Sequence, residues 1–527
     1  MTKKHLVVMD VPGIKKYVFG TDRLVEIRGA SGLLAQLNEV ETPAFLEERL
    51  SRENVDCIFS GGGAGQFIIT AELPKLEQAM EQLQSLYSDM SRGGLRLLYG
   101  ISPYDEHQYS ISLDHAFLQL KKKKDEMPVT SASLLHTGFI RECDSCAGMA
   151  SQSVKYGGDT SVLCDACARK VTFGKKKGLW GKFIRFLEQR QIDPDAWEMP
   201  TDFEKIGEMC KARRGYTALI YADGNAMGKL IKQIRKKSDF QCFSQVVDQS
   251  ITEACHEALF EICPPVNGVV PANILLLGGD DLLVYMTADS ALDFAVEVSR
   301  RFTQKTKSFF DGEPFFDQVL QGRGLTVSLG IVYGKSHTPF SFMFSQAEEL
   351  LKSAKQAGSR HPDAKDFYSP PFVDFHIITQ FNQSKVVHSR KNFLQLNGAI
   401  PVKLYQKPYA IEDAAQLLTH AQKLIYSGIP RSRLKRMGYA PFADKMNGTL
   451  EFLKLYTRCS TNGQREAVHN ALAEFGCVPD MPWKAPDRSG GEEDIWTSTM
   501  LVDLMEIVQF TTKNHHRKGG WSHASQS

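Results

Sequence analysis

Residues 272–286 read ANILLLGGDDLLVYM, two apolar runs on either side of Gly-Gly-Asp-Asp. Short apolar runs that flank a glycine pair predict two antiparallel strands joined by a tight turn. Gly278 and Gly279 would let a nucleotide lie against the backbone, because glycine has no side chain to keep it away. Asp280 and Asp281 would lie at the tip, where adjacent carboxylates favour a bound cation. An ordinary Asp-Asp turn is the alternative for this motif taken alone.

The elements around this hairpin occur twice along the chain. HLVVM (5–9), a glycine hairpin and LRLLYGI (95–101) are followed about 210 to 230 residues later by TALIY (217–221), the GGDD hairpin and TVSLGIVY (326–333). Each copy is expected to run strand, helix, hairpin, helix, strand, helix. This order predicts an α+β fold of two ferredoxin-like domains.

Asp223 follows the first strand of the second copy directly. In a ferredoxin-like sheet the first strand and the hairpin are neighbours, so Asp223 is expected to converge with Asp280 and Asp281. Three carboxylates beside the free backbone amides of a turn predict a two-metal site for nucleotidyl transfer, with Mg²⁺ (or Mn²⁺) as the metal.

Four further residues of the second copy are expected to contact the nucleotide: Gly224, Asn225, Lys229 and Lys355. The first two belong to the turn after Asp223, where backbone amides can bind phosphate. Lys229 begins the next helix, and Lys355 lies on the helix predicted through 347–355. Each lysine can equally be a solvated surface residue.

The first copy keeps the glycine hairpin without the acids. Gly61, Gly62 and Gly63 occupy the position of GGDD, and Asp10 is the carboxylate that remains on the first strand. One carboxylate cannot hold two metals, so this copy is expected to bind nucleotide without turning it over. A plain tight turn is the alternative.

Four cysteines form two C-x2-C pairs separated by seventeen residues: Cys143, Cys146, Cys164 and Cys167. Four thiolates at this spacing predict a structural Zn²⁺ site with tetrahedral ligands. A redox dithiol would need only one pair.

A basic segment, RKVTFGKKKGLWGKFIR (169–185), carries seven Lys and Arg residues and no acid, with Trp180, Phe183 and Phe186 nearby. Such a segment could contact RNA, although a solvated helix face is the alternative. The organisation predicted for the whole chain is as follows: 1–140 first repeat domain, 141–172 zinc ribbon, 173–214 basic helical linker, 215–380 second repeat domain, 381–513 C-terminal helical domain, 514–527 disordered tail.

The composition excludes several classes of protein. Of the 527 residues 42% are hydrophobic and 24% charged, which indicates folded domains rather than disorder or fibre. Sixty-three Lys and Arg against sixty-one Asp and Glu leave a net charge of +2, so nucleic acid would have to bind through local patches. No signal peptide or membrane span is expected, and the predicted location is the cytoplasm.

Five motifs in order resemble one family: DVPGIKKYVFGTDRLVEIRGASGLL, SGGGAG, the paired C-x2-C, YADGNAMGK and LLLGGDD. This set is similar to the large polymerase-cyclase subunit of type III CRISPR effector complexes and to the stand-alone CRISPR polymerases. The resemblance covers roughly residues 5 to 380, and the helical end is similar to the family's C-terminal helical domain. In that family two palm domains face each other, so the two repeats are called the first palm and the second palm from here on.

The resemblance implies a function. The family joins ATP molecules by 3′–5′ bonds into cyclic oligoadenylates that activate antiviral defence. By position, Asp223, Asp280 and Asp281 would hold the metal, Gly278 and Gly279 would contact the nucleotide, and Gly61 to Gly63 would help to seat the acceptor ATP. The partners implied are guide or target RNA and other subunits of such a complex, or a second copy of the chain, and no membrane. The family's N-terminal His-Asp nuclease domain is expected to be missing, since the chain has no His-Asp dipeptide.

Other functions stay open at the level of sequence. A similar architecture occurs in GGDEF diguanylate cyclases, so a cyclic dinucleotide is a second candidate product. A catalytically silent scaffold subunit that binds RNA and nucleotide is the main alternative to an enzyme. A nucleic-acid-binding zinc-ribbon protein is disfavoured by the near-zero net charge.

Overall fold

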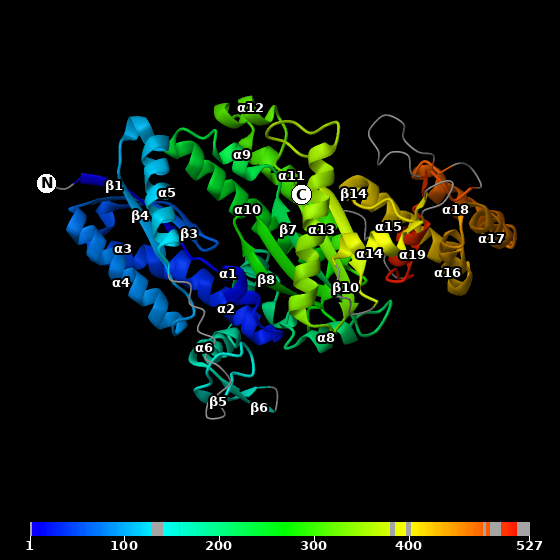
Figure 1. The fold of residues 1–527 in the computed structure, drawn as a ribbon, viewed down its shortest axis with the longest axis horizontal. Coiled ribbons are helices and arrows are strands. Elements are labelled where there is room, and N and C mark those ends of the chain that lie inside the picture. The colour runs from blue at the N-terminus through cyan, green and yellow to red at the C-terminus, as the bar shows by residue number, and fades with distance from the viewer. Residues whose placement is uncertain are drawn as a thin grey trace, which may run out of the picture.

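The computed structural model describes residues 3–127, 141–156, 159–176, 178–379, 385–396, 402–477, 481–484 and 497–513. Figure 1 shows the first palm at one end, the second palm in the centre and the C-terminal helices at the other end. The small cysteine-bearing unit lies beside helix α2 of the first palm. The predicted tail, 514–527, lies outside the described residues.

The first palm contains one antiparallel sheet with the strand order β2-β3-β1-β4. This is the order of a ferredoxin-like fold, in which the first strand lies between the third and the fourth. Its strands and helices are β1 (Lys3–Asp10), α1 (Ile14–Phe19), α2 (Leu24–Gln36), α3 (Thr42–Leu50), β2 (Val55–Gly61), β3 (Ala64–Ala71), α4 (Leu73–Ser91), β4 (Leu98–Pro103) and α5 (Tyr109–Asp125).

The second palm repeats this order as β10-β7-β9-β8 and extends it by two strands, β11 and β14, beside β10. Strand β11 is parallel to β10, and β14 is antiparallel to β11. The elements are β7 (Tyr216–Gly224), α9 (Met227–Ile231), α10 (Lys237–Ile262), β8 (Ala272–Gly278), β9 (Asp281–Thr287), α11 (Ala291–Phe310), α12 (Pro314–Leu320), β10 (Val327–Lys335), α13 (Phe340–Arg360), β11 (Phe372–Ile377) and β14 (Tyr409–Ala410). The predicted fold class, two ferredoxin-like α+β domains, is confirmed.

Two local expectations for the first palm need correction. The strand predicted from residue 95 begins at Leu98, because Leu95 and Leu97 are buried in an irregular segment before it. The single helix expected between the first strand and the hairpin is a longer helical stretch, since α2 passes through a π-helical turn (Leu37–Glu41) directly into α3.

A shared core joins the two palms. One buried hydrophobic cluster includes Val7 and Phe67 of the first palm together with Leu219 and Tyr285 of the second. Helix α10 lies along β2, where Gln241 Nε2 donates a hydrogen bond to the carbonyl oxygen of Cys57 (3.3 Å). The relative position of the two hairpins is therefore set by packing between the palms.

The cysteine-bearing unit contains β5 (Gln152–Tyr156), β6 (Asp159–Leu163) and α6 (Asp165–Gly174). Helix α6 packs closely on α2, because glycines stand at both contacts. A Cβ atom on Gly29 would lie 1.8 Å from the carbonyl oxygen of Lys170, and one on Gly174 would lie 1.9 Å from that of Val25. Side chains larger than hydrogen would separate these helices.

The aromatic residues of the basic segment belong to the core. Helix α7 (Trp180–Gln189) buries Trp180, Phe183 and Phe186, and α8 (Phe203–Glu208) follows it. Lys170 is also buried, and its Nζ donates to the carbonyl oxygen of Tyr17 (2.6 Å). These rings cannot stack on RNA bases as the sequence suggested, because the amphipathic face of α7 needs them for packing.

The C-terminal part is mainly helical, with α14 (Val386–Phe393), α15 (Ile411–Tyr426), α16 (Arg431–Tyr439), α17 (Lys445–Thr457), α18 (Asn462–Glu474) and α19 (Leu501–Val508). It also contains a small sheet that the sequence did not predict, formed by β12 (Gln395–Leu396), β13 (Val402–Lys403) and β15 (Thr497–Ser498). Buried Arg390 of α14 donates two hydrogen bonds to Asp374 of β11 (2.7 and 2.8 Å), which fastens this part to the second palm. Across the described ranges, no helix combines the length and apolar character needed to cross a bilayer.

Candidate active site

The GGDD hairpin joins β8 and β9 and brings two carboxylates beside the end of β7. Ala222 of β7 pairs with Leu282 of β9, so the next positions along the two strands are Asp223 and Asp281. Asp280 lies in the turn, where Gly279 adopts a φ of 60°. The Asp280 carboxylate lies so close to β7 that a Cβ on Gly224 would come within 2.7 Å of its Oδ2. The structure thus brings together the three carboxylates that the sequence singled out.

The two hairpin carboxyls, Asp280 and Asp281, resist ionisation. Burial, followed by the charge of Asp223, raises the pKa of Asp280 to about 6. Burial and the charges of Asp223 and Asp280 raise the pKa of Asp281 to about 7, against a lowering effect of Lys15. Both carboxyls ordinarily titrate near 3.8. A site that resists ionisation in this way is suited to a cation, which would supply the missing positive charge.

Lys355 holds the third carboxylate. Its Nζ forms an ion pair with Asp223 and donates to the carbonyl oxygen of Gly224 (2.7 Å). The three carboxylates are spaced more widely than the four cysteines of the cysteine-bearing unit. Among the described residues, only those cysteines form a group whose metal-ligating atoms all lie within 4.8 Å of one another.

Asn225 and Lys229, two further residues that the sequence predicted to contact the nucleotide, make no contact with the carboxylates that the structure records. The Asn225 amide donates to Thr326 Oγ1 (2.9 Å), and its backbone N–H donates to the Thr326 carbonyl (2.8 Å), so this residue ties β7 to the start of β10. Lys229 lies on α9 with an exposed side chain. The structure therefore brings Lys355 to the carboxylates and places Lys229 at the surface.

The two glycine hairpins face each other. A Cβ atom on Gly278 would lie 3.9 Å from the backbone nitrogen of Gly62 in the first palm. Gly62 and Gly63 have positive φ angles of 59° and 86°, and a Cβ on Gly63 would collide with Ile14 at 1.9 Å. With Gly61, which ends β2, they form the tip that approaches the GGDD hairpin.

The first palm keeps part of the same arrangement. Lys124 of α5 forms an ion pair with Asp10 at the end of β1 (2.8 Å), as Lys355 of α13 does with Asp223. Asp10 pairs in register with Ala64, which stands where Asp281 stands in the second palm. The carboxylate at the end of β1 is thus paired with its own lysine, and Ala64 supplies no second carboxylate opposite it.

Sequence reasoning missed four residues around the second palm's carboxylates: Lys15, Tyr221, Asp248 and Glu348. The Asp248 carboxylate on α10 accepts a hydrogen bond from the backbone N–H of Gly279 (3.0 Å). The Tyr221 hydroxyl donates to Asp281 Oδ1 (3.3 Å). Only Tyr221 had a signal in the sequence, because it shares a face of β7 with Asp223 two positions later.

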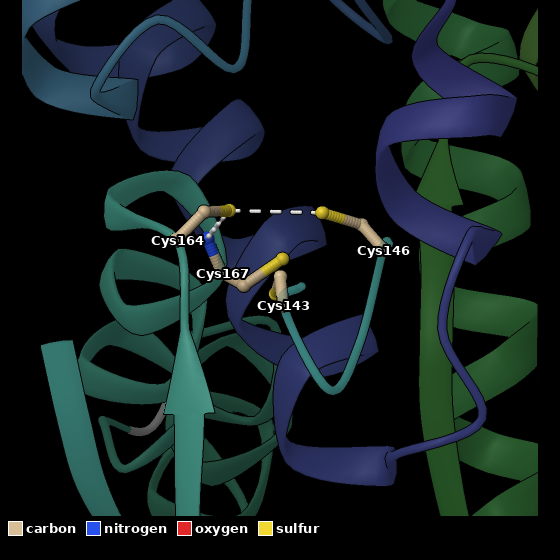
Figure 2. A group of neighbouring side chains, drawn as sticks. All are labelled: Cys143, Cys146, Cys164 and Cys167. Carbon is tan, nitrogen blue, oxygen red and sulfur yellow. Dashed lines mark hydrogen bonds between the residues drawn. The ribbon is translucent and has the colours of Figure 1, made fainter. Parts of the chain in front are cut away.

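The four cysteines meet as predicted (Figure 2). Their sulfur atoms all lie within 4.8 Å of one another, and Cys146 Sγ lies 3.6 Å from Cys164 Sγ. Tetrahedral Zn²⁺ with bonds of about 2.3 Å requires sulfur atoms about 3.8 Å apart. Hydrogen bonding from Cys167 lowers the pKa of the Cys164 thiol to about 5, while the same hydrogen bond raises the pKa of Cys167 and burial raises that of Cys146, so that without metal Cys164 is the thiol that ionises first. The cluster fits a structural zinc ion.

Comparison with known proteins identifies the fold and one domain. Residues 216–362 match the family model described as Cas10/Cmr2, second palm domain. The second palm of this chain is therefore similar to that of Cas10. The crystal structure of Csm1 in T. onnurineus has the same fold, with a TM-score of 0.55 and 15% identity over 96% of this chain and 69% of that chain. The Csm1–Csm4 cassettes in complex with cA4 and with AMPPNP match with TM-scores of 0.54 and 0.53, each at 15% identity and with the same coverage.

The matched structures contain longer chains than this one. The chain spans between 54% and 70% of the length of the solved Csm1 chains compared with it. No curated protein sequence matches it. The resemblance drawn from the five motifs is confirmed, and the family-model match falls on the second palm, which carries GGDD.

Proposed function

We propose that this chain is a Mg²⁺-dependent nucleotidyltransferase that joins ATP molecules into cyclic oligoadenylates for antiviral CRISPR-type signalling. The observation that carries the proposal is the convergence of Asp223, Asp280 and Asp281 opposite a second glycine hairpin, with the pKa of two of the three carboxyls raised. The matched Csm1–Csm4 structures in complex with cA4 and AMPPNP support it.

In this proposal each residue has a defined task. Asp223, Asp280 and Asp281 hold Mg²⁺, which would lower the pKa of an attacking ribose hydroxyl and neutralise the departing pyrophosphate. Lys355 would exchange Asp223 for the triphosphate when metal is bound, since its ammonium group already lies at the carboxylates. Gly278 and Gly279 let the donor nucleotide lie against the backbone of the hairpin.

The first palm would seat the acceptor. Its hairpin glycines, Gly61 to Gly63, face the second palm, and its carboxylate is already neutralised by Lys124. A nucleotide bound there would present its hydroxyl without being activated itself. Two ATP molecules held on facing hairpins would thus meet in a defined orientation.

The cofactors and partners follow from the same sites. Zn²⁺ on the four cysteines would be structural, because all four ligand positions are filled by thiolates. The chain is also proposed to act with other subunits of a type III CRISPR complex, since the matched chains are those of Csm1 with Csm4.

The test is to incubate the purified chain with Mg²⁺ and each nucleoside triphosphate, with and without RNA, and to identify products by mass spectrometry. Cyclic oligoadenylate from ATP is expected, and Asp280→Ala and Asp281→Ala should each reduce it by at least about a hundredfold. A product made equally well by both variants would refute the metal assignment. Nucleotide binding without any product, in the presence and absence of RNA, would instead show a scaffold subunit.

A further inference from the structure

Lys15 of the first palm reaches across to the second palm beside its carboxylates. It lies in the first turn of α1, two positions after Gly13, which has a φ of 76°. Its Nζ lies 2.5 Å from Glu348 Oε1 on α13 and 5.5 Å from the centre of the Tyr221 ring. The side chain of Lys15 is 58% exposed, so its ammonium group is open to solvent and to a ligand.

Two lysines therefore flank the carboxylates from different domains. Lys355 lies against Asp223, and Lys15 lies over Tyr221, whose hydroxyl bonds to Asp281. Glu348 and Lys355 are about two turns apart on α13 and so lie on the same face of the helix.

The ion pair between Lys15 and Glu348 is poorly suited to a purely structural role. Both partners are partly exposed, and exposed ion pairs of this kind stabilise proteins little. The palms are already joined by a shared apolar core. The lysine ammonium group has three donors. It would bind a polyphosphate more strongly than it binds a single carboxylate, because a polyphosphate offers several negative charges at once.

We propose that Lys15 exchanges Glu348 for the polyphosphate of the nucleotide held at the second palm. The first palm then supplies a phosphate-binding cation to the second palm's site. This inference rests on the proposed function, because it requires a nucleoside triphosphate at the carboxylates. Glu348 holds the lysine near the site until the nucleotide arrives and competes with the nucleotide for it.

A merely structural ion pair and a phosphate-binding lysine predict different results. If Lys15 binds phosphate, its loss weakens nucleotide binding, whereas loss of Glu348 leaves binding unchanged or strengthens it. If the pair only joins the palms, both losses act in the same direction. Exchanging the two charges would then restore the stability and the nucleotide affinity that the single substitutions remove.

The experiment compares Lys15→Gln, Glu348→Gln and the reversed pair Lys15→Glu/Glu348→Lys, with Lys16→Gln as an exposed control on the same helix. Calorimetry measures Mg²⁺-dependent binding of a non-hydrolysable ATP analogue and, separately, of AMP. Lys15→Gln should weaken binding of the ATP analogue about five- to tenfold and should weaken binding of AMP less than twofold. Glu348→Gln should bind the analogue as tightly as the wild type or up to about fivefold more tightly, and Lys16→Gln should match the wild type. The reversed pair should melt at the wild-type temperature and still bind the analogue weakly.

Three results would overturn the inference: equal losses in Lys15→Gln and Glu348→Gln, recovery of affinity in the reversed pair, or an equal loss for AMP. Asp281→Asn separates this failure from failure of the proposed function. If Asp281→Asn loses the analogue while Lys15→Gln binds it normally, only the role of Lys15 is wrong. If the wild type does not bind the analogue, or Asp281→Asn binds it as well as the wild type does, both proposals fall.

Discussion

Replacing either hairpin carboxylate should stabilise the metal-free protein at neutral pH, although it should abolish the proposed activity. The folded chain raises the pKa of Asp280 from 3.8 to about 6 and that of Asp281 from 3.8 to about 7. At about 1.36 kcal/mol per pKa unit these shifts correspond to at most about 3 and 4 kcal/mol. Because water reaches part of both side chains, about half of each value is a realistic expectation. Asp280→Asn should then raise the free energy of unfolding by about 1.5 kcal/mol.

The sign of the pH dependence follows from the raised pKa. Between about pH 4 and pH 7 the folded state binds more protons than the unfolded state, so stability falls as the pH rises. The advantage of Asp280→Asn or Asp281→Asn should be complete at pH 8 and shrink as the pH falls towards 5. A gain of about 1.5 kcal/mol in the free energy of unfolding corresponds to a rise of about 3 to 6 °C in Tm for a domain of the size of the second palm.

The assay is thermal unfolding in buffer without added divalent cation and without a chelator, because a chelator would also remove zinc. Asp10→Asn is the matched control, since Asp10 occupies the corresponding strand end and is paired with Lys124. That control should lose up to about 1 kcal/mol rather than gain stability. Mg²⁺ at ten times its Kd should stabilise the wild type by about 1.4 kcal/mol and leave Asp281→Asn unchanged. Hairpin variants that melt below the wild type at pH 8 would refute the reasoning.

Three further predictions concern other parts of the molecule. Cys164→Ser should release about one zinc ion per chain and lower the free energy of unfolding by several kcal/mol, because it opens a closed tetrahedral site. Elemental analysis measures the zinc content and thermal unfolding measures the stability. Full retention of zinc would contradict this prediction. Gly62→Phe should block the proposed binding site for the acceptor ATP, opposite Gly278. Product should then be lost, while calorimetry still detects about one of two ATP sites. Unchanged turnover and stoichiometry would show that the first palm has only a structural role. Gly29→Ala should separate α2 from α6, because the added Cβ would lie 1.8 Å from the Lys170 carbonyl oxygen. The free energy of unfolding should fall by about 1 to 3 kcal/mol. Melting at the wild-type temperature would show that these helices adjust without strain.

The sequence by itself determined the features that depend on local chemistry. The GGDD hairpin and the C-x2-C pairs are short motifs whose turn residues and ligand spacing carry their own structural meaning, so both could be predicted. The double ferredoxin-like fold could be predicted because the order of strands and helices recurs and few topologies satisfy it. The convergence of Asp223 with the hairpin followed from that topology.

Only the tertiary structure decided which groups from distant segments meet. Lys15 and Glu348 are separated by 333 positions, and their contact depends on how the palms pack. Asp248 reaches Gly279 from the middle of α10, and no local pattern marks it. Trp180 and Phe183 illustrate the same limit, because a basic segment with aromatic residues looks alike whether its rings face RNA or a core. Short-range preferences cannot distinguish these outcomes, since the burial of a side chain is settled by surfaces that come together only when the chain has folded.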